Sequence, residues 1–461
     1  MGLVTPIDSV FLLGESREHP MHVAGLELFV PPEGSGPDYA REVYENLIAN
    51  PTTRALFRTR PSRPLGTLGN FSTSVDSEID YDYHVRLSAL PRPGGIKELL
   101  ALVSRMHGSL LDRHRPLWEM HVIEGLADGR IAFYIKFHHA LLDGVSSLKL
   151  MQRQMSPDPD ERGIPAPWAP PRNEKPRANA LVSTAAGFNP LSFVRGGVSL
   201  VKDIAGMAPA TVRLANQAMK DSEVVRPLSA PKSMFNVNIG GARRFAAQSW
   251  DIDRILTVGK KTGTKLNDVV LAMCSGALRQ YLIEHNALPD DPLIAAVPVS
   301  LRAPGDDRIG GNAVSMILCN LGTNLDGPLS RLSVVTKSMD HGKEAMLGLS
   351  PSQAMAYGAM NMSSIAFAQI PGADRITNPS FNILISNVPG PREDLYYNGA
   401  RLDGLYPVSI VLDGFALNIT LTSRPGFLDF GVIGCRQSVP HLQRLLTHLE
   451  DSLAELEKAV A

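Results

Sequence analysis

Hydrophobic and polar positions recur along the chain with two periods, which predict strands and helices in alternation. Residues 21–29, 118–124 and 130–137 alternate or run apolar as strands do, and a glycine-containing turn separates the last two. Residues 96–111 instead place apolar side chains three and four positions apart, which is typical of an amphipathic helix. Residues 145–155 have the pattern of a further helix.

The second half of the chain repeats this mixture. Residues 267–284 predict a long helix with Asn267 or Asp268 at its N-cap, and a leucine-bearing face predicts a closing helix over 442–456. Five further segments are expected to be strands: 293–299, 313–319, 382–386, 416–422 and 428–434. Because strands interleave with helices in both halves, the sequence predicts an α/β fold of two layers, each with its own sheet.

A proline-rich segment separates the halves. Prolines crowd residues 157–176 without any helical or strand period, so an extended linker is expected there. Residues 178–225 are expected to form a helical crossover packed on the second domain, with an amphipathic element lying on lipid as the alternative. We therefore predict an N-terminal domain at 1–156, the linker and crossover at 157–230, and a C-terminal domain at 231–461.

The composition restricts the class of protein and its partners. Of 461 residues, 44% are hydrophobic and 20% charged, which is the balance of a globular protein. The net charge of −1 supplies no field to attract nucleic acid. No secretory leader and no apolar run of about 18 residues is evident, so a cytoplasmic protein is expected that meets membranes or lipid droplets only peripherally. The three cysteines are scattered, which predicts neither a disulfide nor a zinc site.

The chemistry-bearing motif is HHxxxDG, formed by His138, His139, Asp143 and Gly144 directly after an apolar strand. A neutral imidazole held at a strand end is suited to take a proton from a hydroxyl near neutral pH. Asp143 is expected to cap the next helix, and Gly144 clears space beside the imidazole. The residues alone leave catalysis and simple packing equally open, and they offer no further ligand at metal-binding spacing.

Other reaction schemes lack their motifs. The chain has no GxSxG nucleophile elbow, no phosphate-binding loop of the required spacing and no evident carboxylate pair. A histidine base without a protein nucleophile remains. Such a base suits direct transfer of a group from a pre-activated donor to an alcohol or an amine.

The motif resembles the HHxxxDG signature of the coenzyme A-dependent acyltransferase superfamily, which includes peptide-synthetase condensation domains. Further segments resemble one branch, the bacterial wax ester synthase/acyl-CoA:diacylglycerol acyltransferases. They are Pro6-Ile7-Asp8 through Glu15 to Met21-His22-Val23, Pro116-Leu117-Trp118, the NDVVLA segment at 267–272, PVSLR at 298–302 and SNVPGP at 386–391. The resemblance implies two domains similar to chloramphenicol acetyltransferase, each a mixed sheet flanked by helices, with a tunnel between them.

The resemblance also implies the reaction and the roles of residues. Acyl-CoA is the expected donor, diacylglycerol or a long-chain alcohol the acceptor, and no cofactor is permanently bound. His139 is expected to be the general base, with His138 orienting the loop, Asp143 structural and Gly144 keeping the acyl path open. From its expected place at a helix N-terminus, Asn267 is the best candidate for the oxyanion donor, with plain helix capping as the alternative. Substrate contacts are expected from Trp118, for which core packing is the alternative, and from Arg302, which either contacts coenzyme A phosphates or braces Asp143.

Three alternatives stay open at this stage. An HxxxxD acyltransferase acting on a phosphorylated glycerol would use His138 with Asp143 and make His138 the essential base. A condensation-domain relative would need carrier-protein partners, and the chain contains no carrier domain. A protein of different class would keep the fold but bind lipid surfaces without catalysis.

Overall fold

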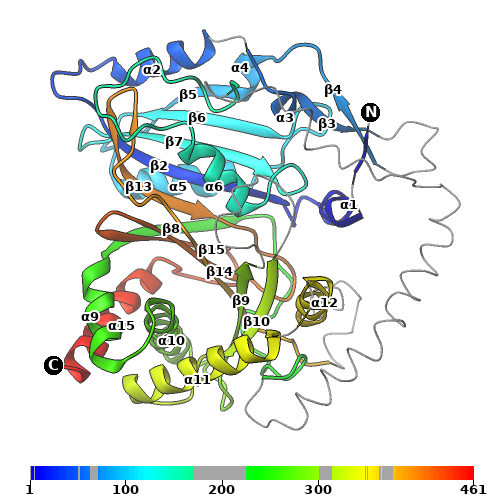
Figure 1. Cartoon of the computed structure of the whole chain (residues 1–461), viewed down its shortest axis with the longest axis vertical. Helices are drawn as coiled ribbons and strands as arrows, with labels where there is room; N and C mark the ends of the chain where they lie inside the picture. The colour runs from blue at the N-terminus through cyan, green and yellow to red at the C-terminus, as the bar shows by residue number, and fades with distance from the viewer. Residues whose placement is uncertain are drawn as a thin grey trace, which may run out of the picture.

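Two six-stranded sheets, each flanked by helices, are stacked in this computed structural model (Figure 1). The structure describes residues 2–4, 6–49, 52–62, 71–170, 225–300, 314–347, 349, 351–362, 365 and 377–461. Each sheet contains parallel and antiparallel pairs: β5 with β6 is parallel in the first, as is β11 with both β9 and β14 in the second. The predicted fold class, two mixed sheets flanked by helices, is confirmed.

The elements of the first half surround a sheet of order β12-β13-β2-β7-β6-β5. In chain order they are β1 (Gly2–Leu3), α1 (Pro6–Gly14), β2 (His22–Val30), α2 (Tyr39–Ile48), α3 (Ala55–Arg58), β3 (Thr59–Ser62), β4 (Ser72–Val75), α4 (Tyr81–His84), β5 (Val85–Ala89), α5 (Ile96–His107), β6 (Trp118–Glu124), β7 (Ile131–His138) and α6 (Gly144–Gln152). β1, β3 and β4 form a small separate sheet.

The second sheet has the order β10-β9-β11-β14-β15-β8. Its half of the chain contains β8 (Arg243–Asp251), α9 (Ile252–Thr262), α10 (Leu266–Glu284), β9 (Ile294–Ser300), β10 (Val314–Asn320), α11 (Pro328–Met346), α12 (Pro351–Asn361), β11 (Ile383–Val388), β12 (Tyr396–Tyr397), β13 (Ala400–Val408), β14 (Leu417–Arg424), β15 (Phe427–Cys435) and α15 (Arg444–Ala459). In Figure 1, α9, α10, α11 and α15 cover the face of this sheet that points away from the first domain. The predicted crossover lies outside the described residues.

One strand of the second half belongs to the first sheet, which corrects the expectation that each half has its own sheet. β13 pairs antiparallel with β2, from Arg401 opposite Val30 to Val408 opposite Ala24. The segment carries Gly404 and Pro407, which interrupt the alternation that a sequence pattern needs. The C-terminal half therefore completes the N-terminal sheet by two strands, β12 and β13.

The alternation of β7 directs its side chains to two different cores. Ile135 and Phe137 belong to an outer core shared with α2 and α6. Tyr134 lies on the opposite face, in a core shared with the second domain. Because successive residues of a strand point to opposite sides, Lys136 and His138 share the face that looks toward the second domain. The end of β7 therefore delivers the motif to the junction of the two domains.

The described part of the proline-rich segment packs on the first domain and does not form the extended linker that was predicted. Ile164, Ala166 and Trp168 are buried, and Trp168 stacks on Trp118 with ring centroids 5.3 Å apart. The Trp168 carbonyl oxygen accepts a hydrogen bond from the Arg54 amide at 2.8 Å. The prolines between these residues hide the buried positions from a sequence pattern. Residues 171–176 lie outside the described residues.

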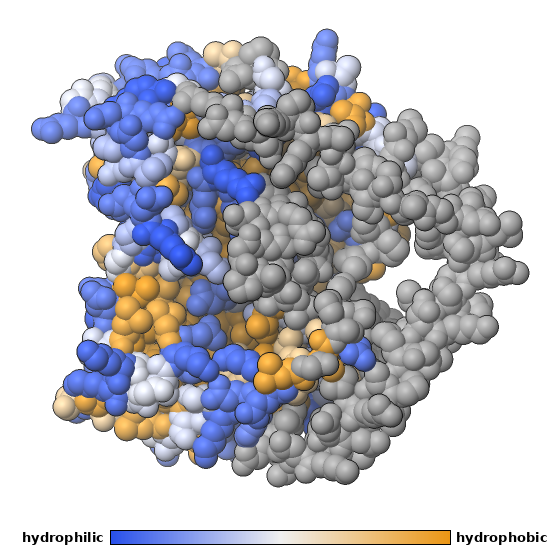
Figure 2. Space-filling model, in the orientation of Figure 1, coloured by the Kyte–Doolittle hydropathy of each residue, from blue (hydrophilic) through white to orange (hydrophobic). Residues whose placement is uncertain are grey.

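The outer surface is largely hydrophilic on the face shown in Figure 2, with smaller groups of hydrophobic residues in its lower half. Within the part of the chain that the structure describes, no helix combines the length and apolar character needed to cross a bilayer.

We expect Trp168→Ala to destabilise the protein, because it removes a side chain that is 1% exposed and leaves a cavity against Trp118. Truncation of a buried tryptophan typically costs about 3–5 kcal/mol of unfolding free energy. Urea denaturation followed by circular dichroism would measure it, with the exposed Asp160→Ala in the same segment as control. Equal midpoints for the two variants would contradict the packing described.

Candidate active site

Main-chain hydrogen bonds fix the two histidines of the motif in place. The His138 amide donates to the Leu117 carbonyl oxygen at 3.0 Å, and the His139 amide donates to the Met21 carbonyl oxygen at 2.8 Å. His138 also lies opposite His22 in the β2–β7 pair. The main-chain hydrogen bonds of the sheet thus continue to the last residue before the turn, so both imidazoles are attached to a rigid part of the main chain.

The turn after the histidines leads directly into α6. The Asp143 carboxylate accepts a hydrogen bond from the Ser146 amide at 2.6 Å, which confirms that Asp143 caps this helix. A Cβ atom built on Gly144 would meet no atom of the described residues within 4 Å. Among the described residues, Gly144 therefore borders open space at the start of α6.

His138 is fully buried and its two ring nitrogens face different partners. Nδ1 accepts a hydrogen bond from the Ala140 amide at 3.1 Å, so the proton of the neutral ring is assigned to Nε2. Nε2 points to the Glu15 carboxylate, with Oε1 at 3.4 Å. Burial raises the pKa of Glu15, but His138 and the Arg113 guanidinium lower it further, and the net pKa is below its ordinary value. His138 is therefore held between a main-chain amide and a carboxylate.

Glu15 also anchors the helix that precedes it. Arg113 donates from Nε to the Glu15 carboxylate at 2.8 Å and from Nη2 to the Leu12 carbonyl oxygen at 2.6 Å. These bonds hold the end of α1 against the segment between α5 and β6. Phe11 of α1 then stacks on the His139 imidazole, with centroids 4.1 Å apart and an angle of 19° between the rings.

The His139 imidazole lies in an apolar setting that keeps it neutral. Its pKa is lowered to about 4, mainly by burial and also by the neighbouring His138, while the Asp143 carboxylate opposes the shift. Nδ1 is buried and has no hydrogen-bond partner among the described residues. Nε2 is consequently the nitrogen left to meet a substrate.

An apolar cluster extends from His139 into the second domain. Phe11 and Met21 pack there against buried residues of β9, β10 and the segments beside β11 and β14. Its other members include Ile294, Ala296, Leu318, Phe381, Leu412, Phe415, Met316, Met362, Ile365, Leu384 and Ile410. The flexible methionine side chains allow such a cluster to adapt to chains of different shape.

Trp118 is a core residue of the first domain. It is 0% exposed, and its indole nitrogen donates to the Phe57 carbonyl oxygen at 2.8 Å. It lies opposite Phe137 in the β6–β7 pair, so it occupies the face of the sheet that His138 does not. This placement favours the packing interpretation over a direct substrate contact.

Asn267 lies at the second position of α10, which corrects the expected N-cap. The helix begins at Leu266 with Lys265 as N-cap, and the Asp268 carboxylate reaches back to accept from the Lys265 amide at 3.2 Å. Among the described residues, no hydrogen bond or ion pair joins Asn267 to His138 or His139. In Figure 1, α10 covers the face of the second sheet that points away from the first domain. An oxyanion role for Asn267 therefore stays a prediction.

The sequence named one site residue that lies outside the described residues, and it missed others. Arg302 lies outside the described residues. Sequence reasoning missed Phe11 and Arg113, because nothing local to either residue signals a contact with the motif. Glu15 lies in the segment from Pro6 to Val23 that carries the family resemblance, but the sequence assigned no role to it. No cluster of three or more His, Cys, Asp or Glu side chains suited to a metal ion occurs in the described ranges.

Comparisons with known proteins cover the whole chain. The pattern of the wax ester synthase/diacylglycerol acyltransferase catalytic domain matches residues 4–270, and that of the WS/DGAT C-terminal domain matches residues 310–457. A probable diacylglycerol O-acyltransferase of Mycobacterium tuberculosis is 53% identical over 461 residues and 100% of both chains. O-acyltransferase WSD of Acinetobacter baylyi is 40% identical, over 99% of this chain and 97% of its own.

Solved structures agree with this similarity. The wax ester synthase/diacylglycerol acyltransferase of Marinobacter aquaeolei superposes with a TM-score of 0.80 at 39% identity, covering 100% of both chains. The starter condensation domain of rhizomide synthetase, solved with C8-CoA, reaches a TM-score of 0.58 at 12% identity, over 100% of this chain and 94% of its own. The second likeness shows a shared fold.

We expect Phe11→Ala to raise the pKa of His139 from about 4 toward its ordinary value of about 6.5, because water would then reach the imidazole. Phe11→Leu keeps an apolar cover and should leave the pKa nearly unchanged. NMR titration of the His139 ring, assigned through its loss in His139→Gln, measures the pKa without any turnover. An unchanged pKa in Phe11→Ala would show that the stacked ring does not shield the His139 imidazole.

Proposed function

The chain belongs to the wax ester synthase/diacylglycerol acyltransferase family, and we propose that in this member His139 is the general base of acyl transfer. The donor is acyl-CoA, and the acceptor is the hydroxyl of diacylglycerol or of a long-chain alcohol. The observation that carries the proposal is the His139 imidazole itself. It follows directly on β7 and stacks on Phe11, with Nδ1 buried and a pKa of about 4 that leaves it neutral at pH 7.

The reaction follows from that geometry. Nε2 of His139 takes the proton of the acceptor hydroxyl while the oxygen attacks the thioester carbonyl carbon. The C–S bond then breaks, the new ester C–O bond remains, and the proton passes from the imidazolium to the leaving thiolate. Proton transfer by a positioned base typically contributes about 10²–10⁴-fold in rate.

The neighbours of His139 position it without taking part in the chemistry. Asp143 caps α6 and fixes the turn. His138 is held by the Ala140 amide and Glu15, so it fixes the loop that carries His139. The apolar cluster that begins at Phe11 and Met21 suits the acyl chain, because its side chains carry no charge and can shield a hydrocarbon chain from water.

The contacts of His138 weigh against the HxxxxD alternative. That scheme needs His138 to accept a proton from a phosphorylated glycerol. Here His138 is 0% exposed, its Nδ1 already accepts from the main chain, and its Nε2 faces a carboxylate. A ring so enclosed has no free lone pair for a substrate hydroxyl, whereas His139 has one.

We expect His139→Ala to lower acyl transfer by about 10²–10⁴-fold, because the proton acceptor is lost. Thiol release from palmitoyl-CoA would be measured with hexadecanol, diacylglycerol or glycerol 3-phosphate as acceptor, and folding checked by circular dichroism. His114→Ala, an exposed histidine, is the matched control, and His138→Ala should retain measurable activity. Release that needs glycerol 3-phosphate and vanishes only in His138→Ala would establish the HxxxxD scheme instead.

We also propose that the protein contacts membranes or lipid droplets peripherally through α1. Its acceptors are apolar lipids that gather at such surfaces. Phe11 of this helix faces His139, while Val10 and Leu13 are 65% and 66% exposed. An exposed apolar pair beside the base suits a helix that lies on lipid next to the substrate entrance.

Replacing Val10 and Leu13 with aspartate should reduce flotation with phosphatidylcholine vesicles that contain diacylglycerol, because charged side chains resist burial in lipid. Leu256→Asp, an exposed leucine on α9, is the control and should float as the unchanged protein does. Unchanged flotation of the double variant would exclude α1 as the contact.

A further inference from the structure

We propose that a pocket of arginines at the junction of the two domains binds the phosphate groups of coenzyme A. This inference deepens the proposed function, because it assigns a place to the polar end of the acyl donor. The pocket encloses about 370 Å³. It is lined by Arg17, Ser104, Arg105, Gly108, Gly241, Ala242, Arg243 and Arg436.

Three of its guanidinium groups are available to a ligand. Arg17, Arg105 and Arg436 are exposed, and none of them forms an ion pair with a described residue. The described residues that line the pocket include no acidic side chain. Arginines gathered without counter-charges repel one another, and a phosphate relieves that repulsion by accepting paired hydrogen bonds from guanidinium groups.

The fourth arginine builds the floor. Arg243 is 5% exposed and donates to the Gly240 and Glu18 carbonyl oxygens at 2.5 and 2.6 Å. Its pKa is lowered by burial to about 10, so it stays charged at neutral pH. These bonds join the loop before β2 to the loop before β8. The pocket therefore rests on a buried, fixed cation that spans both domains.

Two glycines allow the surrounding backbones to meet. A Cβ atom on Gly241 would lie 2.6 Å from the Arg17 carbonyl oxygen, which no side chain tolerates. A Cβ atom on Gly108 would lie 3.2 Å from the Gly241 carbonyl oxygen. The loops before β2 and β8 thus approach this closely because Gly241 carries no side chain, and Gly108 lets the end of α5 come close to them. The pocket is a built feature of the fold.

Short stretches of chain connect this pocket to the base. Arg17 comes two residues after Glu15, which faces His138, and four residues before Met21, whose carbonyl oxygen holds the His139 amide. A chain of four residues spans at most about 14 Å. The extended pantetheine arm separates the thioester of acyl-CoA from its phosphates over such a distance. A donor anchored by its phosphates here can place its thioester at His139.

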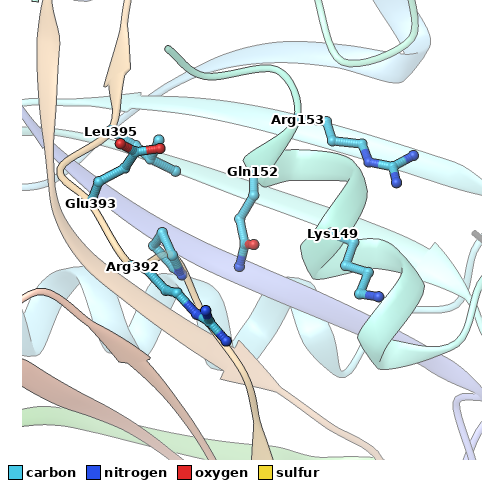
Figure 3. Close-up of a pocket in the computed structure, with 7 residues that line it drawn as sticks. Lys149, Gln152, Arg153, Arg392, Glu393 and Leu395 are labelled. Carbon is cyan, nitrogen blue, oxygen red and sulfur yellow. The ribbon is translucent and has the colours of Figure 1, made fainter. Parts of the chain in front are cut away.

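A second pocket of about 310 Å³ lies between α6 and the loop after β11 and is less suited to phosphate (Figure 3). Lys149, Arg153 and Arg392 contribute positive charge, but Glu393 lines it too. Figure 3 shows Arg392 and Glu393 projecting from the same loop, opposite the helix that carries Lys149. A carboxylate among the cations repels a phosphate, so the arginine pocket is the better anion site.

The test uses Arg105→Gln with Arg436→Gln in one variant, with Arg41→Gln on α2 as the matched exposed control. The KM for palmitoyl-CoA should rise about tenfold or more, as expected when charge-assisted hydrogen bonds are lost, while kcat stays near its original value. The rise should shrink with added salt, which screens the arginines in the unchanged protein. Palmitoyl-N-acetylcysteamine, a thioester without phosphates, should react equally with both proteins.

Calorimetry of coenzyme A binding needs no turnover and separates this inference from the proposed function. Weaker binding of coenzyme A to the double variant, and a smaller loss for 3′-dephospho-coenzyme A, support the pocket even if His139 proves not to be the base. Unchanged coenzyme A binding and unchanged KM overturn it, whatever the rate of transfer. So does a variant that loses only its flotation with phosphatidylglycerol vesicles, because the phosphate bound would then be a lipid headgroup.

Discussion

The pairing of β2 with β7 is the constraint on which the site depends. The segment that leads into β2 supplies Phe11 to the His139 ring and Glu15 to the His138 ring. The last residue before the strand, Met21, holds the His139 amide through its carbonyl oxygen. Register in a sheet is fixed by alternation, so a shift of one residue would withdraw all of these contacts together. The His139 ring is therefore positioned by a strand register as much as by its own turn.

A polar network beneath the site gives that register a second support. Lys136, fully buried, donates to the Met106 and Ser109 carbonyl oxygens at 3.0 and 2.8 Å and pairs with Glu119 at 2.6 Å. It thereby closes the C-terminal end of α5 with a positive charge, where the helix dipole favours one. The same helix lies between the two sheets, where Ser104 accepts from the Phe245 amide. A buried charge on β7 and the helix that it caps thus tie the first sheet to the second domain.

The sequence predicted the elements whose periodicity is local. β6 matches its predicted range, and β7 and α5 differ from theirs by a few residues at their ends, because each carries an uninterrupted apolar pattern. β13 escaped prediction because glycine and proline interrupt it and its partner β2 lies in the other half of the chain. The packing of Trp168 was not predicted because the prolines around it are typical of a linker. α10 begins at Leu266 because a side chain in its first turn, not at its N-cap, accepts the cap hydrogen bond.

In the candidate site too, local features were predictable from the sequence and contacts between distant segments were not. The HHxxxDG motif is recognisable from the spacing of its residues, and the capping role of Asp143 follows from ordinary helix chemistry. The contacts of Phe11 and Arg113 with this motif arise only when segments distant in sequence meet, so no local pattern carries them. Trp118 was open to two interpretations until the strand register placed it on the opposite face from His138.

The exchange of β13 has a consequence for dissecting or recombining this chain. Without residues 396–408, β2 would become a mostly apolar edge strand nine residues long, with the main-chain groups on its freed edge unpaired. Such an edge recruits other strands and promotes aggregation. A fragment that ends before the crossover is thus not an autonomous folding unit. Chimaeras between relatives preserve the first sheet only when this hairpin is kept with the N-terminal half.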